Sequence, residues 1–220
     1  MRKWLLILVA IGTNCVLLFA QGNKQDYNKM RDQLLLYKKM YAYADSINKT
    51  DEAGVLMKEG LAIADSCDKL HPASYYGSVG EQMQLSHFNE AAFLFYIANL
   101  RYRYYNASNP GYSPSGDGAL AASMSYVFGE MVGMYLKTNV TNFIAILKKS
   151  VDWCETHDYP FFPRSKSPDK YAQQIAALKK AIADLETNKV KYQATWDAER
   201  KKMEFGFDEA IKQMDEKIKH

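Results

Sequence analysis

The sequence is poor in the residues that most often mark a chemical site. Its 220 residues include only three cysteines and four histidines. No Cys-x-x-Cys or His-Glu-x-x-His spacing occurs, and there is no Gly-x-Ser-x-Gly, phosphate-binding glycine loop or dinucleotide fingerprint. These absences remove the usual signatures of a hydrolase, a nucleotide enzyme or a metal centre. We therefore expect neither a metal nor a cofactor.

The chain also lacks a strong excess of charge of either sign. Its 28 basic and 25 acidic residues give a formal net charge of +3. Removal of Arg2 and Lys3 with an export segment leaves 26 basic residues against 25 acidic ones. A nearly neutral chain gives no electrostatic reason to expect nucleic acid or an anionic membrane as its partner.

A long apolar run stands at the start of the chain. A basic beginning is followed by apolar residues from Trp4 to Ala20, which is typical of a signal peptide. As a helix this run would measure about 25 Å, short of the ~30 Å hydrocarbon core of a membrane. We expect residues 1–20 to be cleaved after Ala20 and the rest to be exported to the periplasm or the extracellular space. A retained membrane anchor is the alternative.

Helical periodicity runs through the rest of the chain, and no pair of segments reads as strands. The pattern predicts an all-α fold, a helical bundle of stacked antiparallel hairpins with a long C-terminal helix. We expect a core domain over 21–165 and the C-terminal helix over 166–220. The stretch "HPASYYGSVG" (71–80) reads as a loop or turn, and "EFGFDE" (204–209) is expected to bend or break the last helix.

Two central helices, about 87–105 and 117–137, are expected to form a hairpin within this bundle. Both are apolar on nearly every side, which is typical of buried helices. The second is also long enough to be considered as a membrane span, but Glu130 within it argues against that. The first carries Arg101 and Arg103, which are tolerable near a core only with polar partners. We expect the two arginines to clamp Asp117 and fix the hairpin.

Three residues are candidates for chemistry at the other end of this hairpin. His87 and Glu90 share a helical face, and Glu130 is expected at about the same level. Two carboxylates and an imidazole can share a proton, act as an acid–base pair or hold a metal. The alternative is that His87 and Glu90 belong to an ordinary first helical turn, where a glutamate favours the helix dipole.

Two further pairs of residues are candidates for a covalent link and a contact surface. Cys67 and Cys154 are the cysteines outside the expected signal peptide, and in an oxidising compartment they either form a disulfide or stay as buried thiols. Phe161 and Phe162 stand in a proline-flanked loop. We consider them for binding a partner.

The stretch "HFNEAAFLFYIANL" resembles the second helix of a tetratricopeptide unit, with Ala91, Phe95 and Ala98 at its alanine–aromatic–alanine spacing. The resemblance covers one unit, at about residues 75–105, and implies stacked hairpins that bind protein or peptide. The expected function is therefore an exported, non-catalytic module that binds a protein or peptide partner. It would act as an inhibitor, an immunity-type protein or an envelope adaptor. The alternatives are an envelope hydrolase using Glu90 and Glu130, and a small-ligand carrier with a tyrosine-lined pocket.

Overall fold

A computed structural model describes residues 24–50, 52–109 and 115–219 of the chain. The expected signal peptide lies outside the described residues. Within them the chain forms eight α-helices and no strand, so the all-α fold is confirmed. The helices are α2 (Lys24–Thr50), α3 (Lys58–Cys67), α4 (Ser74–Gln84), α5 (Phe88–Ser108), α6 (Asp117–Leu136), α7 (Val140–Thr156), α8 (Pro168–Thr187) and α9 (Lys189–Lys219).

Local sequence accounts for several helix ends. The Asn139 side chain caps α7 by accepting a hydrogen bond from the Asn142 backbone N–H at 2.9 Å. Ser167 stands before α8 and Pro168 is the first residue of that helix, where its missing N–H costs nothing.

Two predictions about helix boundaries are wrong. Residues 74–84 form helix α4 rather than a loop, because Tyr75, Val79 and Met83 recur at helical spacing and are buried. Residues 204–209 lie within the uninterrupted helix α9. The long C-terminal segment is instead divided at Asn188, between α8 and α9.

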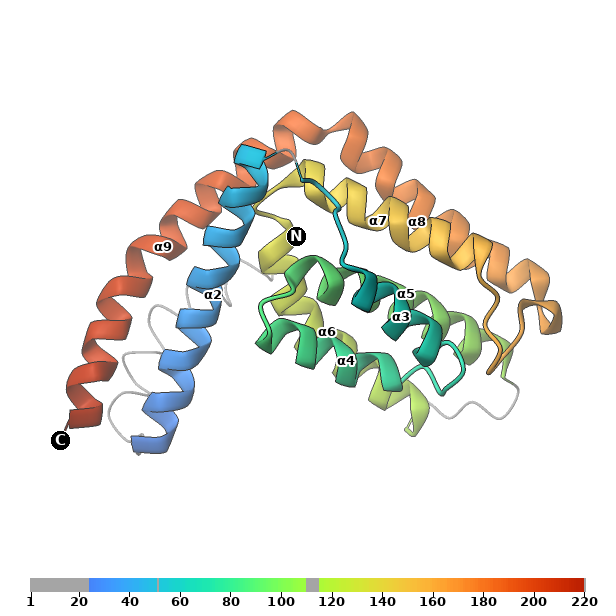
Figure 1. The fold of residues 1–220 in the computed structure, drawn as a ribbon, viewed down its shortest axis with the longest axis horizontal. Helices are drawn as coiled ribbons and strands as arrows, with labels where there is room; N and C mark the ends of the chain where they lie inside the picture. The colour runs from blue at the N-terminus through green and yellow to red at the C-terminus, as the bar shows by residue number, and fades with distance from the viewer. Residues whose placement is uncertain (1–23, 51, 110–114, 220) are drawn as a thin grey trace. The chain divides into compact units, whose positions relative to one another are not determined.

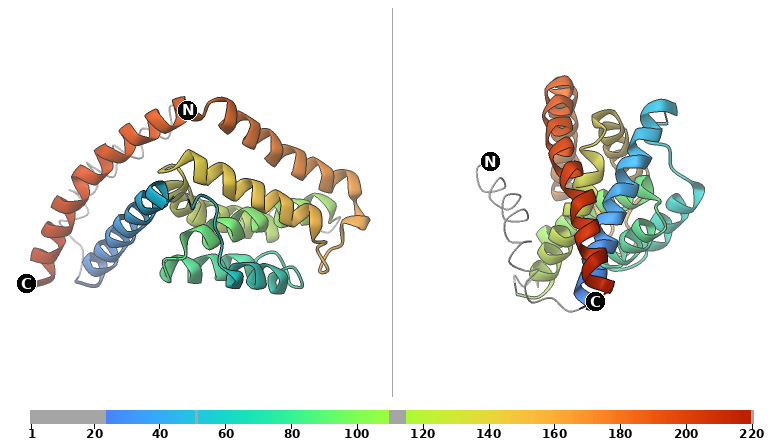
Figure 2. Two further views of the ribbon diagram at one scale, coloured as in Figure 1. Left: turned by 45° about the horizontal axis from the view of Figure 1, so that its top comes forward. Right: turned by 90° about the vertical axis from the view of Figure 1, so that its left-hand side faces the viewer.

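The described chain divides into two compact units, with the division passing through α2 and α9. The larger unit spans residues 37–200 and includes residues 166–200 of the expected C-terminal domain. Helix α5 lies at its centre and packs against α3, α4, α6, α7 and α8 (Figure 1). The left view of Figure 2 shows α8, α7, α5 and the α3/α4 pair following one another as layers.

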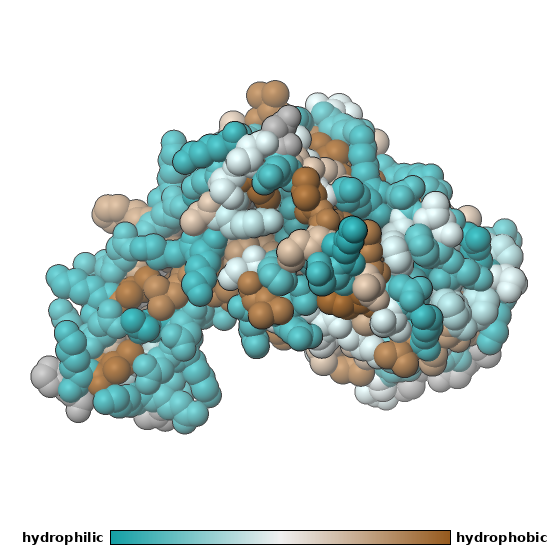
Figure 3. All heavy atoms as spheres, in the orientation of Figure 1, coloured by the Kyte–Doolittle hydropathy of each residue, from teal (hydrophilic) through white to brown (hydrophobic). Residues whose placement is uncertain are grey.

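The smaller unit contains residues 24–36 and 201–219 of the described chain. Tyr27 and Met214 are its buried apolar residues, and Arg31 Nε lies 2.6 Å from Asp215 Oδ1. In Figure 3 its surface is mostly hydrophilic, with hydrophobic residues in small separate groups. This composition is typical of solvated helices joined by one narrow apolar seam.

Candidate functional site

Arg101 belongs to the larger unit, and its side chain is fully buried. Its Nε and Nη2 atoms donate to the two carboxylate oxygens of Asp68 at 2.8 and 3.0 Å. Nη1 donates to the Tyr171 hydroxyl, and Nη2 also reaches the His157 carbonyl at 3.0 Å. The guanidinium therefore contacts α8 and the residues that directly follow α3 and α7.

Asp68 is equally well satisfied, which explains how a buried carboxylate is tolerated there. The Tyr75 hydroxyl donates to Oδ1 at 2.8 Å, and the Trp153 indole N–H donates to Oδ2 at 3.0 Å. Burial by itself would lower the pKa of the Arg101 guanidinium, but the hydrogen bond to Asp68 and the negative charge of that carboxylate raise it overall. A buried ion pair satisfied on both sides is a structural device that holds helices together.

The expected clamp between Arg101 and Asp117 is corrected by this geometry, because the partner of Arg101 is Asp68, 33 residues away. Asp117 instead accepts a hydrogen bond from the Tyr102 hydroxyl at 3.4 Å and lies 3.6 Å from His71 Nε2. Arg103 is exposed. The sequence shows that Arg101 needs an acid but does not show which one.

Glu90 is also buried and has a structural contact. Its Oε1 accepts a hydrogen bond from the Met57 backbone N–H at 2.7 Å, at the start of α3. A carboxylate there stabilises both the free N–H groups and the positive end of the helix dipole. A side chain at Gly60 would overlap Glu90, since its Cβ would lie 2.7 Å from Glu90 Cγ.

The other two chemical candidates do not join Glu90. His87 Nδ1 lies 2.9 Å from Gln82 Oε1, next to the start of α5. Glu130 is exposed on α6. Among the residues that the structure describes, no hydrogen bond or ion pair links His87 or Glu90 to Glu130, and no group of three His, Cys, Asp or Glu could hold a metal.

Neither cysteine is bonded to the other: Cys67 and Cys154 are both free and buried. Cys67 Sγ lies 3.7 Å from Ser78 Oγ. Burial raises the pKa of the Cys154 thiol to about 12, so it stays protonated at neutral pH. Both behave as small apolar core residues.

Phe161 and Phe162 belong to an aromatic cluster. Phe161 is 39% exposed, and its ring contacts His71, Tyr105 and Tyr159. The Phe162 ring contacts Tyr104 and Tyr105 and is partly covered. Both rings therefore pack the 159–163 loop onto the end of α5, with one edge of Phe161 left exposed.

Helix α6 is the element that departs most from expectation. Its apolar sequence predicts burial, but only Val132, Tyr135 and Leu136, near its C-terminal end, are buried. Leu120, Tyr126 and Val127 are 38%, 61% and 53% exposed. With the exposed residues Ala119, Ala122, Ser123 and Glu130 they recur at helical spacing as one stripe, here called the α6 face. No helix among the described residues is long and apolar enough to span a membrane.

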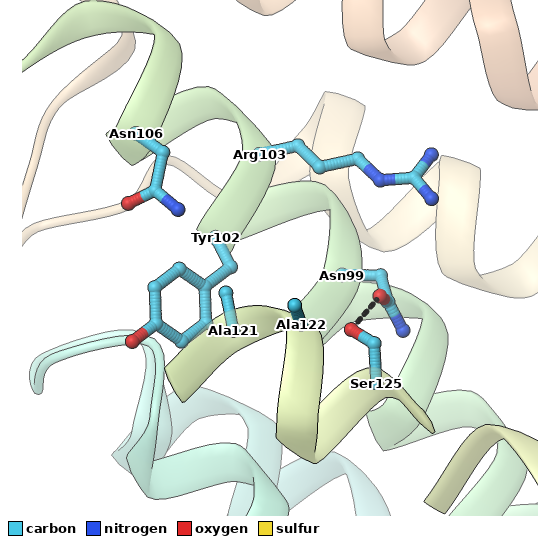
Figure 4. A pocket seen from close by; sticks show the side chains of 7 residues that line it. All are labelled: Asn99, Tyr102, Arg103, Asn106, Ala121, Ala122 and Ser125. Carbon is cyan, nitrogen blue, oxygen red and sulfur yellow. Dashed lines mark hydrogen bonds between the residues drawn. The ribbon is translucent and has the colours of Figure 1, made fainter. Parts of the chain in front are cut away.

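A shallow hollow of about 230 Å³ adjoins this face between α5 and α6. Figure 4 shows its lining: Asn99, Tyr102, Arg103 and Asn106 from α5, and Ala121, Ala122 and Ser125 from α6. The Ser125 hydroxyl donates to Asn99 Oδ1 at 2.8 Å and lies 2.9 Å from the Tyr76 hydroxyl. Ala122 belongs to both the hollow and the α6 face.

A second hollow, of about 220 Å³, lies between α7 and α8. Lys179 Nζ and Glu155 Oε1, both in its lining, lie 2.7 Å apart in an ion pair. Pockets that enclose a drug-sized ligand are larger than either hollow, at roughly 300–1,000 Å³. These two hollows are too small for the tyrosine-lined carrier pocket considered from the sequence.

Comparisons with known proteins identify no relative of this chain. No protein-family model matches it, and neither a curated protein nor a solved structure does so. The tetratricopeptide resemblance of residues 75–105 stays a prediction.

Proposed function

We propose that this chain is an exported, non-catalytic helical module that binds a protein or peptide partner through the α6 face. An inhibitor, an immunity-type protein or an envelope adaptor fits this description. The observation that carries the proposal is the exposure of Leu120, Tyr126 and Val127 on one face of a helix. Contiguous apolar surface on a folded protein is typical of a site of interaction.

The contacts of the chemical candidates support a binding role over catalysis. Glu90 holds the start of α3, and His87 contacts Gln82 beside the start of α5. Arg101 and Asp68 satisfy each other in the core. Each of these groups has a structural use, whereas the exposed apolar residues of α6 have no such use within the described chain.

Site-specific photocrosslinking tests the binding role. A photoreactive phenylalanine analogue replaces Tyr126 in one variant and Val190 in the control, because Val190 is 84% exposed on α9. Expressed in the source organism, the position 126 variant should crosslink one partner protein in stoichiometric amounts, and the position 190 variant should not. Crosslinking at neither position, or the same mixture of proteins at both, would contradict the proposal.

The export part of the proposal is tested separately. Removal of residues 1–20 should leave a mature chain that begins at Gln21. N-terminal sequencing of the protein from the envelope and secreted fractions measures this directly. A chain that retains Met1 and sediments with the membrane would favour the retained anchor.

A further inference from the structure

Arg103 differs from Arg101, two residues earlier, in being exposed at the surface. It lines the hollow between α5 and α6, and Figure 4 shows its side chain extending away from the Tyr102 hydroxyl. Within the described parts of the chain, no hydrogen bond or ion pair occupies its guanidinium. A planar guanidinium with free donors is well suited to a carboxylate.

The neighbouring polar groups of the hollow are mostly engaged. Asn99 donates to the Phe95 carbonyl at 2.9 Å and accepts from Ser125 at 2.8 Å. The nearby acid, Asp117, accepts a hydrogen bond from the Tyr102 hydroxyl. Figure 4 shows that this hydroxyl and the Arg103 guanidinium lie at opposite ends of the hollow. An acidic group from a partner would therefore meet Arg103 without facing Asp117 directly.

The hollow continues into the α6 face through Ala122. Glu130, also exposed, is the charged residue of that face and lies eight residues further along α6. At 1.5 Å per residue, the backbone of Glu130 lies about 12 Å along α6 from that of Ala122, or roughly two helical turns. The surface therefore has a cation beside the hollow at its edge, mostly apolar residues along α6, and an anion further along the same helix.

We infer that the partner is an amphipathic helix which lays an apolar stripe on the α6 face, with an acidic side chain against Arg103 and a basic one against Glu130. The inference rests on the proposed binding role of α6 and names the chemistry of its partner. A helix is the natural occupant because apolar residues spaced three and four apart match the spacing of Ala119, Ala122 and Tyr126. The opposite charges at the two ends select a partner that carries both signs.

Two synthetic helical peptides of 18 residues test the inference on the mature chain. Both carry one leucine–alanine stripe; the first has a glutamate and a lysine eight residues apart, and the second has lysine at both positions. By fluorescence anisotropy the wild type should bind the Glu/Lys peptide roughly three- to tenfold more tightly than the Lys/Lys peptide. Arg103→Glu, which leaves two acids at the site, should reverse the preference. Lys191→Glu, an exposed change on α9, should leave it unaltered.

Three other results overturn the inference. If both peptides bind equally to the wild type and to Arg103→Glu, and Val127→Asp abolishes binding, α6 is a docking face without charge selection. If neither peptide binds, while Tyr126 still crosslinks a partner, that partner is not an amphipathic helix of this chemistry. If sedimentation shows a dimer that Val127→Asp dissociates, the occupant is a second copy of this chain.

Discussion

Arg101 shows at the scale of one residue how a full charge can lie inside an apolar helix. An isolated buried charge is costly, so it is tolerated only with an opposite charge and complete hydrogen bonding. Asp68 supplies the charge, while Tyr171 and the His157 carbonyl take up the remaining donors. Arg103 faces solvent two residues later, because a helix turns about 100° per residue.

Arg101→Met should destabilise the chain by about 3–5 kcal/mol, because it leaves the Asp68 carboxylate buried without its counter-charge. Urea unfolding followed by circular dichroism measures the change. Arg103→Met is the matched control and should alter the free energy of unfolding by no more than about 0.5 kcal/mol. Adding Asp68→Asn to Arg101→Met should recover part of the loss. A loss below about 1 kcal/mol for Arg101→Met would show that the pair is not the buried anchor described here.

The partly buried pair of Asp45 and Arg200 should contribute a smaller, pH-dependent stabilisation. Arg200 donates to the two oxygens of Asp45 at 2.7 and 2.8 Å, and this hydrogen bonding lowers the pKa of Asp45. Because the folded-state pKa lies below the unfolded value of about 3.9, the stabilisation is complete above that value and is lost as the pH falls through the folded-state pKa.

Asp45→Asn should therefore lower the free energy of unfolding at pH 7 by no more than about 1 kcal/mol, and the difference from wild type should shrink below about pH 4. Urea titrations at several pH values between 7 and 3 measure this. Asp152→Asn, at an exposed carboxylate, serves as the control. If the difference between wild type and Asp45→Asn instead grew as the pH fell, the folded-state pKa of Asp45 would lie above its unfolded value. That result would contradict the prediction.

Helix α4 shows at the scale of an element that tertiary burial can outweigh local propensity. Its sequence contains Gly77 and Gly80, which weaken a helix by about 1 kcal/mol each and make the stretch read as a loop. Burial of Tyr75, Tyr76, Val79 and Met83 against the core offsets that cost. The connection before α3 behaves differently, because Gly54 has a positive φ of 71° that an L side chain rarely adopts.

Two alanine substitutions should therefore change stability in opposite directions. Gly54→Ala should destabilise the chain by roughly 2–4 kcal/mol, because its backbone is left-handed and its Cβ would lie 2.6 Å from Ala145 Cβ. Gly77→Ala should stabilise it by about 0.5–1 kcal/mol, since a Cβ there meets nothing within 4 Å. Thermal and urea unfolding of the two variants measure the difference. If both variants changed stability in the same direction, either the left-handed backbone at Gly54 or the open space beside Gly77 would be contradicted.

At the scale of the whole molecule, nearly all of the buried apolar residues fall between Met40 and Leu185. Tyr27 and Met214 are the exceptions among the described residues. The larger unit, residues 37–200, therefore contains its own core, its own buried ion pair and the α6 face. A unit of this size buries enough surface to fold by itself.

The fragment 37–200 should accordingly unfold in one cooperative transition and retain a near-ultraviolet circular dichroism signal from its packed aromatic rings. Arg101→Met in the same fragment provides a destabilised control. A fragment with helical content but no near-ultraviolet signal, and with strong binding of a hydrophobic dye, would show that its core needs the other unit.

The sequence by itself determined the helices with the clearest local signals. The Ser167–Pro168 start of α8 and the all-round apolar pattern of α5 were sufficient because capping and periodicity depend on neighbours in the chain. Only the tertiary structure decided that Arg101 meets Asp68, that Glu90 holds the start of α3, and that α6 keeps its apolar face exposed. Each of these depends on which helices lie side by side, and periodicity shows that a face is apolar without showing what covers it.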